Sequence, residues 1–213
     1  MAKTMTVDFD DFGANHIISD MCQSHDCRDK LVELKNLTPK FKVTLFTIPC
    51  EVTPELGAWC FENRDWVEIA YHGFFHTSNY ECEKTSYEEF GSQMGAMIEH
   101  FGDLFVNGFK APGWQISDDV LKWLADHEFW VADQSYNDER RPEQLPAYIN
   151  NNGKFLAYLP RSAPEQVAPV KTVEAWHGHT WDCVGNGIYE TFDQLRQATE
   201  KVDEFKFISE VLA

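Results

Sequence analysis

Residues 69–78 read Ile-Ala-Tyr-His-Gly-Phe-Phe-His-Thr-Ser, an apolar run that ends in two histidines four positions apart. The run is short and apolar, which predicts a buried strand over 66–71 that stops just before His72. Neutral imidazole nitrogens suit zinc and its neighbours, so His72 and His76 are candidate ligands of one metal ion. Taken alone, the same spacing also fits two ordinary surface or core histidines.

The alternation of a short β-rich run and a helical pattern recurs along the chain. Further strands are expected over 4–9, 42–48, 106–111, 129–132, 155–159, 173–176 and 205–209. Helices are expected over 26–37 and after hydroxyl N-caps at Thr53, Ser86, Ser117 and Thr191, the last three ending near 101, 127 and 202. This alternation predicts an α/β fold, a distorted (β/α)7-8 TIM-like barrel, with a flat doubly wound sheet as the alternative. The chain contains no repeat or Pro/Gly/Ser linker, so 1–213 is expected to form a single domain.

Charged and imidazole side chains stand at or just past the ends of five expected strands. They are Asp10 with Asp11, His72, Lys110, Asp133, and His177 with His179. In βα barrels the carboxyl ends of the strands form the rim where active sites are built. We therefore expect these side chains to gather into one site.

One set of these residues suits a catalytic metal. Asp11, His72 and His76 would offer one oxygen and two nitrogens to a divalent ion and leave positions open for water and substrate. Such coordination lowers the pKa of bound water toward ~7. Neighbouring strand side chains point to opposite faces, so Asp11 is expected to bind the metal and Asp10 to act as the base. A solvated turn is the alternative for the Asp-Asp pair.

The remaining polar residues are candidates for proton transfer. Lys110 would pair with Asp10 or Asp133 and hold the base ionised, or would otherwise be a snorkelling lysine. His177 and His179 share a face of their strand, and either is a candidate general acid, with His179 preferred.

Aromatic side chains near the expected rim are candidates for substrate binding. Trp114, Trp181 and Phe74 would offer flat faces to a sugar ring, although aromatic residues belong to the core by default.

The bulk composition narrows the possible partners and compartment. A net charge of −17 disfavours nucleic acid and anionic membranes, and fits a neutral or cationic substrate or simply solubility. The six cysteines form no CxxC pair, which predicts reduced thiols rather than a zinc knuckle. No signal-peptide pattern and no apolar run of membrane-spanning length is visible, so a cytoplasmic protein is expected.

Taken together, these motifs resemble the polysaccharide deacetylase family (carbohydrate esterase family 4). The resemblance spans roughly residues 5–180 and rests on Phe9-Asp10-Asp11, His72-Gly73-Phe74-Phe75-His76, Lys110-Ala111-Pro112, Asp133, and His177 or His179. It implies a metal-dependent hydrolase that removes the acetyl group of an N-acetylated sugar or a related small molecule. The metal would be Zn²⁺ first, with Co²⁺, Ni²⁺ or Mn²⁺ possible, and a backbone N–H of Tyr136 or Phe74 would bind the oxyanion.

The chain departs from the family pattern in three places. Phe12 stands where the family has glycine, Gly73 replaces a hydroxyl residue, and Lys110 replaces arginine. These departures bear on the substrate more than on the metal. A deformylase- or amidase-like hydrolase, a non-haem iron oxygenase with the same two-histidine, one-carboxylate set, and a non-catalytic carbohydrate-binding barrel are the alternatives.

Overall fold

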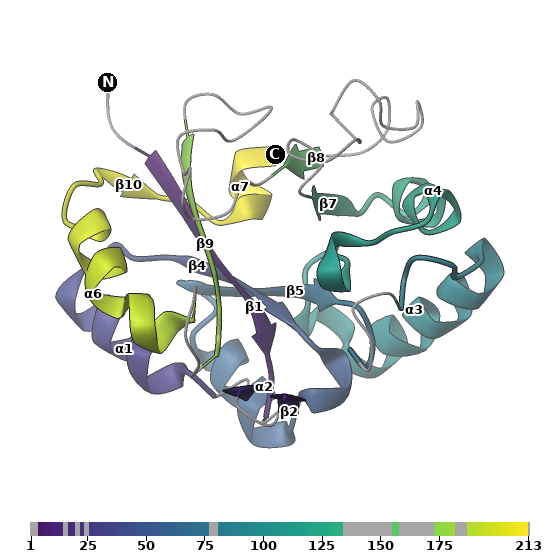
Figure 1. The fold of residues 1–213 in the computed structure, drawn as a ribbon, viewed down its shortest axis with the longest axis horizontal. Helices are drawn as coiled ribbons and strands as arrows, with labels where there is room; N and C mark the ends of the chain where they lie inside the picture. The colour runs from purple at the N-terminus through teal and green to yellow at the C-terminus, as the bar shows by residue number, and fades with distance from the viewer. Residues whose placement is uncertain are drawn as a thin grey trace.

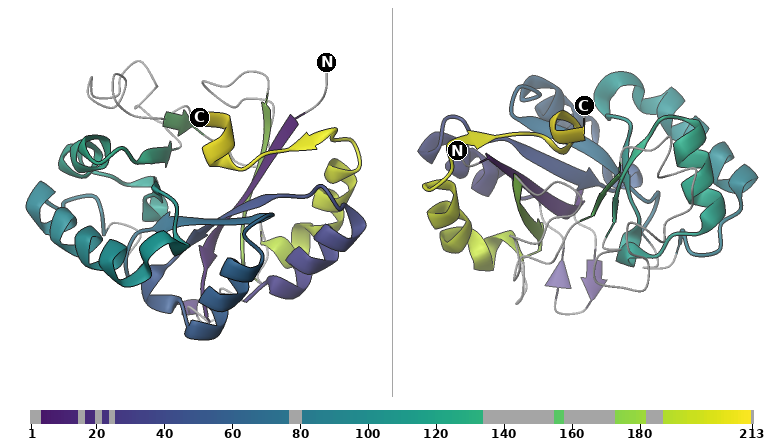
Figure 2. Two further views of the ribbon diagram at one scale, coloured as in Figure 1. Left: turned by 180° about the vertical axis from the view of Figure 1, so that it is seen from behind. Right: turned by 90° about the horizontal axis from the view of Figure 1, so that it is seen from above.

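The computed structural model describes residues 4–14, 17–19, 22–23, 26–76, 81–133, 155–157, 173–181 and 187–212. Its main feature is one eight-stranded sheet, which curls and carries helices on its outer side (Figures 1 and 2). Every pairing within this sheet is parallel, as successive βα units require. The predicted α/β fold with a distorted, barrel-like sheet is confirmed.

The strands follow an order that brings distant parts of the chain together. The order is β10 (Glu204–Phe205), β1 (Thr4–Phe12), β4 (Val43–Thr47), β5 (Val67–His72), β6 (Gly108–Lys110), β7 (Trp130–Asp133) and β8 (Phe155–Ala157), and β9 (Val173–His179) also pairs with β1. A separate two-stranded sheet joins β2 (Ile17–Ser19) to β3 (Cys22–Gln23). Because the strands of the main sheet are parallel, their carboxyl ends meet at one rim.

Helices cover the convex side of the sheet. They are α1 (Arg28–Leu37), α2 (Pro54–Glu62), α3 (Tyr87–Phe101), α4 (Asp118–Asp126) and α6 (Ile188–Thr199) (Figures 1 and 2). The caps predicted at Thr53, Ser86 and Ser117 are confirmed, since each hydroxyl accepts a hydrogen bond from the backbone N–H three residues later. Short 3₁₀ turns lie at Pro49–Glu51, Gly102–Leu104 and Pro112–Trp114.

Two predicted elements near the end of the chain are wrong. Thr191 does not cap α6, because its backbone N–H already bonds to the carbonyl of Gly187, which starts the helix one turn earlier. The strand expected over 205–209 stops at Phe205. The side chain of Glu210 accepts the N–H of Phe207, and this contact begins a helix, α7 (Ile208–Leu212), instead.

The inside of the curled sheet holds a small apolar layer between two polar ends. The layer consists of Phe46, Ala70, Trp130, Ala132 and Ile208. Along β5, alternate residues face inward, so Glu68 lies at the amino end, Ala70 in the layer and His72 at the carboxyl end. The main apolar core lies on the other side of the sheet, under the helices.

Two further observations concern the cysteines and the helices. Among the cysteines whose side chains the structure describes, Cys27, Cys50, Cys60 and Cys82 have free thiols. Among the helices that the structure describes, none combines the length and apolar character needed to cross a bilayer.

Candidate metal centre and active site

Two adjacent aspartates of β1 face the same pocket because the strand is irregular where they lie. The pairing with β4 shifts register between Phe9 and Phe12, so β1 carries an extra residue there. Asp11 adopts a φ of 63°, in the left-handed region. This bulge breaks the usual alternation of strand side chains, so that Asp10 and Asp11 both line the pocket.

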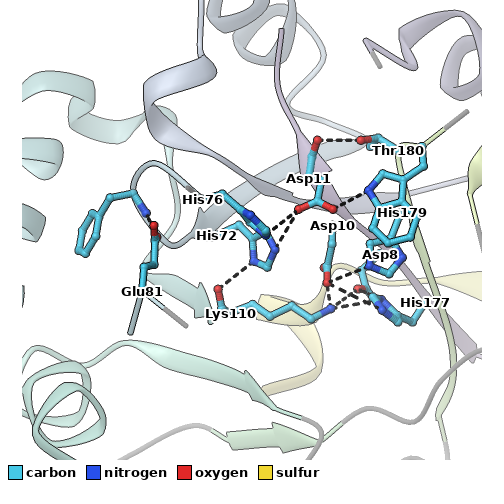
Figure 3. Close-up of polar contacts among 12 residues, drawn as sticks. Asp8, Asp10, Asp11, His72, His76, Glu81, Lys110, His177, His179 and Thr180 are labelled. Atoms are coloured by element: carbon cyan, nitrogen blue, oxygen red, sulfur yellow. Dashed lines mark hydrogen bonds and ion pairs between the residues drawn. The ribbon is translucent and has the colours of Figure 1, made fainter. Parts of the chain in front are cut away.

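Asp11, His72 and His76 converge on one point (Figure 3). Oδ1 of Asp11 lies 3.3 Å from Nε2 of His72 and 3.1 Å from Nε2 of His76. Nδ1 of His72 lies 2.9 Å from the carbonyl oxygen of Lys110, which can only accept, so Nδ1 carries the proton and Nε2 presents a lone pair. Oδ1 of Asp11 is buried and accepts no hydrogen bond. Two electron-rich atoms thus face each other, an arrangement that a cation between them would stabilise.

The charges around the pocket also fit one divalent cation. Asp8, Asp10 and Asp11 are all buried, and Lys110 is the buried cation beside them. With neutral histidines, these described residues leave two negative charges uncompensated. Buried unpaired charge is costly, so the set matches an ion of charge +2. The residues present therefore fit the metal that the sequence predicts.

Neighbouring groups fix the orientation of Asp11. The indole N–H of Trp181 donates to Oδ2 of Asp11 at 2.6 Å, and the Thr180 hydroxyl donates to its carbonyl oxygen at 2.7 Å. Oδ1 is thereby left to face the two histidines.

Asp10 lies beside this set and pairs with a buried lysine. Its Oδ1 is 2.7 Å from Nζ of Lys110, whose side chain is fully buried. Burial by itself would raise the pKa of Asp10, but the charge of Lys110, helped by His177 and other imidazoles, lowers it to about 2. Asp10 is therefore an ionised carboxylate at neutral pH, as a general base must be.

Asp8 is a functional candidate that the sequence reasoning missed. It is wholly buried, and its Oδ2 lies 3.0 Å from Nζ of Lys110 and 2.8 Å from Nδ1 of His177 (Figure 3). The signal was available in the sequence, because Asp8 and Asp10 share a face of β1 and an aspartate inside a buried strand needs a partner.

His179 is the histidine of β9 that lines the pocket. The register of β1 and β9 sets it opposite Asp10, with its Nε2 at 4.0 Å from Oδ2 of Asp10. Its ring stacks on the ring of Trp181, with the ring centres 3.8 Å apart. Burial lowers the pKa of His179 to about 4, despite the nearby Asp10, so the ring is neutral at pH 7. His177 lies deeper, in contact with Asp8 and Lys110.

The pocket has a volume of about 220 Å³ and is partly lined by aromatic rings. Of the predicted substrate-binding residues, Trp114 and Trp181 line it. Each also has a second contact, since Nζ of Lys110 lies 4.2 Å from the centre of the Trp114 ring and Trp181 bonds to Asp11.

The prediction for Phe74 is wrong. Its ring is 3% exposed and packs on Phe90 in the core beneath the helices, with ring centres 5.3 Å apart. Gly73 has a φ of 62°, and the turn that it makes directs the ring inward. The backbone N–H of Phe74 donates to Oε1 of Glu81 at 2.6 Å, so this N–H is occupied and cannot serve as a free oxyanion donor. A Cβ at Gly73 would be strained by this positive φ and would lie 2.7 Å from Cγ of Pro112, which explains why glycine stands there.

Two predicted residues lie at the limit of what the structure describes. Asp133 ends β7, with the backbone of Ala132 beside Lys110 on β6, but its side chain lies outside the described residues. Tyr136 lies outside them altogether. The catalytic part expected of Asp133 and the oxyanion contact of Tyr136 remain predictions.

Comparison with known proteins supports the fold. No protein-family model and no curated protein sequence matches the chain. Among solved structures, a family 4 acetyl xylan esterase from Clostridium thermocellum, in complex with a cobalt ion, has a TM-score of 0.60 and 13% identity, covering 98% of this chain and 90% of that one. The Bc1960 peptidoglycan N-acetylglucosamine deacetylase has a TM-score of 0.58 and 13% identity, covering 96% and 85%.

A third similar structure is a CE4 family pseudoenzyme from Bacillus anthracis, with a TM-score of 0.58 and 14% identity, covering all of this chain and 66% of that one. At such identities the likeness shows a shared fold. The sequence motifs resemble those of carbohydrate esterase family 4, and these comparisons confirm that resemblance at the level of the fold. Since active enzymes and a pseudoenzyme share it, the side chains in the pocket must carry any argument about activity.

Proposed function

We propose that the protein is a metal-dependent hydrolase that removes the acetyl group from an N-acetylated sugar or a related small amide. The observation that carries the proposal is the convergence of Asp11 Oδ1 with Nε2 of His72 and His76, directly beside the ionised Asp10. A metal site without a neighbouring base would fit a structural ion equally well. The two together fit hydrolysis.

Asp11, His72 and His76 would hold the divalent ion, with Zn²⁺ expected first. Once bound, such an ion polarises a carbonyl group and makes water a better nucleophile at neutral pH. Asp10 takes the proton of the attacking water. Lys110, at 2.7 Å, keeps Asp10 ionised until then.

His179 is the proposed acid that protonates the departing nitrogen. It lines the pocket, whereas His177 is held deeper by Asp8 and Lys110. Because burial keeps the His179 ring neutral at pH 7, it must receive a proton during the reaction before it can donate one. Its Nε2 lies 4.0 Å from Oδ2 of Asp10, a separation that one bridging water would span, and Asp10 is therefore the proposed source.

The size of the pocket favours a small reacting group. A volume of about 220 Å³ is below the ~300–1,000 Å³ typical of pockets that enclose whole drug-sized ligands. An acetamido group would enter, with the sugar ring resting at the mouth near Trp114 and Trp181. The names of the similar structures point the same way, since they include an acetyl xylan esterase and a peptidoglycan N-acetylglucosamine deacetylase.

The test is acetate release from a panel of N-acetylated sugars by the protein after chelation, followed by addition of Zn²⁺, Co²⁺, Ni²⁺ or Mn²⁺. Activity should disappear with chelation and return with metal, in the absence of oxygen. The free metal should also stabilise the fold, by about 2.7 kcal/mol at a concentration of 100 times its Kd.

Each alternative predicts a different result in the same experiment. Turnover that needs Fe²⁺ and oxygen would indicate an oxygenase. Binding of sugars without any release of acetate would indicate a carbohydrate-binding barrel. Unfolding that is unchanged by all four metals would show that the three-residue set is not a metal site.

A further inference from the structure

We propose that Asp8 is a positioning residue of the active site, which fixes the orientation of His177 and shares Lys110 with Asp10. The inference rests on the proposed function, since it gives Asp8 a part in the same reaction. Asp8 does not line the pocket and would touch neither metal nor substrate. Its effect would pass through the two side chains that separate it from Asp10.

The position of Asp8 follows from strand register. The parallel pairing of β1 with β9 sets Asp8 opposite His177 and Asp10 opposite His179. Asp8 is fully buried, and one oxygen, Oδ2, makes both contacts, at 2.8 Å from Nδ1 of His177 and 3.0 Å from Nζ of Lys110 (Figure 3). A carboxylate without water around it depends on these two partners.

The location of the proton on His177 can be inferred from its neighbours. Nδ1 of His177 lies 2.8 Å from the carboxylate of Asp8 and 3.2 Å from Nζ of Lys110. Without a proton, Nδ1 would place its lone pair against the closer, negatively charged oxygen. Lys110 does not need Nδ1 as an acceptor, because it has two carboxylates and the ring of Trp114, whose centre is 4.2 Å away. Nδ1 therefore carries the proton and donates it to Asp8.

This orientation determines which atom of His177 faces the base. With Nδ1 bound to Asp8, Nε2 lies 3.8 Å from Oδ2 of Asp10. Metal-binding and catalytic histidines are commonly fixed by such a carboxylate on the far nitrogen. The ammonium group of Lys110 also contacts the carboxylates of both Asp8 and Asp10. Its positive charge is therefore shared between them, and Asp10 is oriented by Lys110 without receiving all of its electrostatic stabilisation.

The test compares wild type with Asp8→Asn, which keeps the shape of the side chain but removes its charge. The protonated nitrogen of His177 is read from its imidazole ¹⁵N NMR signals, in the full chain with and without zinc. Turnover, KM and zinc content are measured on the same samples. Glu68→Gln is the matched control, because it also converts a buried interior carboxylate to an amide, but at the other end of the barrel.

The expected result has two parts. Wild-type His177 carries its proton on Nδ1, and Asp8→Asn loses this preference, since an amide can donate to Nδ1 as well as accept. Turnover of Asp8→Asn falls about 10–100-fold, the usual effect of losing a carboxylate behind a histidine, while KM and zinc content stay at wild-type values. Glu68→Gln changes none of these quantities.

Two results would overturn the inference: an unprotonated Nδ1 in wild type, or turnover of Asp8→Asn equal to that of Glu68→Gln. If Asp8→Asn does not fold, the wild-type NMR signals decide alone. If wild type releases no acetate from any substrate, the proposed function fails, and the same signals still decide whether Asp8 holds His177.

Discussion

The inside of the barrel has two polar ends, and both contain buried carboxylates that are stabilised in different ways. At the carboxyl end, Asp10 and Asp11 face a lysine and imidazoles. At the amino end, Glu68 receives hydrogen bonds from the hydroxyls of Thr44 and Ser209. Burial is nearly the same at the two ends, with 3% exposure for Asp10 and 7% for Glu68.

The partners, and not the burial, decide the charge at each end. The pKa of Asp10 is lowered to about 2 because positive groups outweigh desolvation, whereas burial raises the pKa of Glu68 despite its two hydroxyl donors. The two neutral hydroxyls satisfy the hydrogen-bonding capacity of Glu68, but they stabilise its negative charge by less than burial destabilises it. A buried acid that faces a cation and imidazoles points to chemistry, and one that faces hydroxyls points to packing.

The largest effect is expected from removing a proposed metal ligand at the carboxyl end. His72→Ala should lower zinc affinity by more than the ~10–100-fold that loss of an outer partner costs, and metal-dependent turnover should be lost with it. Zinc content after dialysis measures this directly. His100→Ala, at an exposed position on α3, should bind zinc as wild type does. Full zinc occupancy in His72→Ala would show that the site is assigned to the wrong residues.

Replacing the proposed base should separate binding from chemistry. Asp10→Asn should keep its zinc and lose about 10²–10⁴-fold in turnover, because the amide cannot accept the proton of the attacking water. Acetate release at saturating substrate, measured together with zinc content, tests this. Loss of zinc from Asp10→Asn would instead make Asp10 a ligand.

Much of the fold was predictable because the signals are local. Strand and helix patterns, and the caps at Thr53, Ser86 and Ser117, depend on neighbouring residues alone. The rim of polar residues followed, since parallel strands must present their carboxyl ends together. Local signals failed where the backbone departs from regular geometry, as at Gly73, where the turn buries the ring of Phe74 and leaves Phe75 49% exposed.

The parts of the site that the sequence could not predict depend on long-range pairing. Asp8 meets His177 only through the register of two strands 169 residues apart, and no local pattern fixes that register. The bulge that turns Asp11 toward the pocket likewise arises from its pairing with β4. The sequence therefore identified the aspartate pair as a motif, but it could not predict how the two side chains are oriented.

A smaller effect, on stability, is expected from removing the buried cation. In the presence of chelator, Lys110→Met should lower the free energy of unfolding by about 3–5 kcal/mol, because Asp10 loses its cationic partner and Asp8 keeps only His177. Lys122→Met is the matched control, since its pair with Asp126 is exposed to solvent and its loss should leave the free energy of unfolding almost unchanged. Urea unfolding measures both variants.

The difference in unfolding free energy between wild type and Lys110→Met should also depend on pH, and the sign of this dependence can be predicted. The folded-state pKa of Asp10 lies below its unfolded value, so its pairing stabilises the fold above the unfolded pKa and this contribution is lost as the pH falls toward about 2. The gap between wild type and Lys110→Met should therefore narrow on acidification. A difference in unfolding free energy that stays constant with pH would mean that Lys110 stabilises the fold by packing alone.

The smallest effect, with the opposite sign, is expected at the amino end. The raised pKa of Glu68 means that the folded chain binds its proton more tightly than the unfolded chain, so the stability of wild type falls as the pH rises through the folded-state pKa. Glu68→Gln removes this titration and keeps an acceptor for Thr44 and a donor for Ser209. Relative to wild type, the variant should gain about 1 kcal/mol or less between mildly acidic and neutral pH. Urea unfolding at several pH values measures the difference, which cancels the titration of all other groups. A difference that does not change with pH would mean that Glu68 titrates alike in both states, and the contrast between the two ends would then rest on geometry alone.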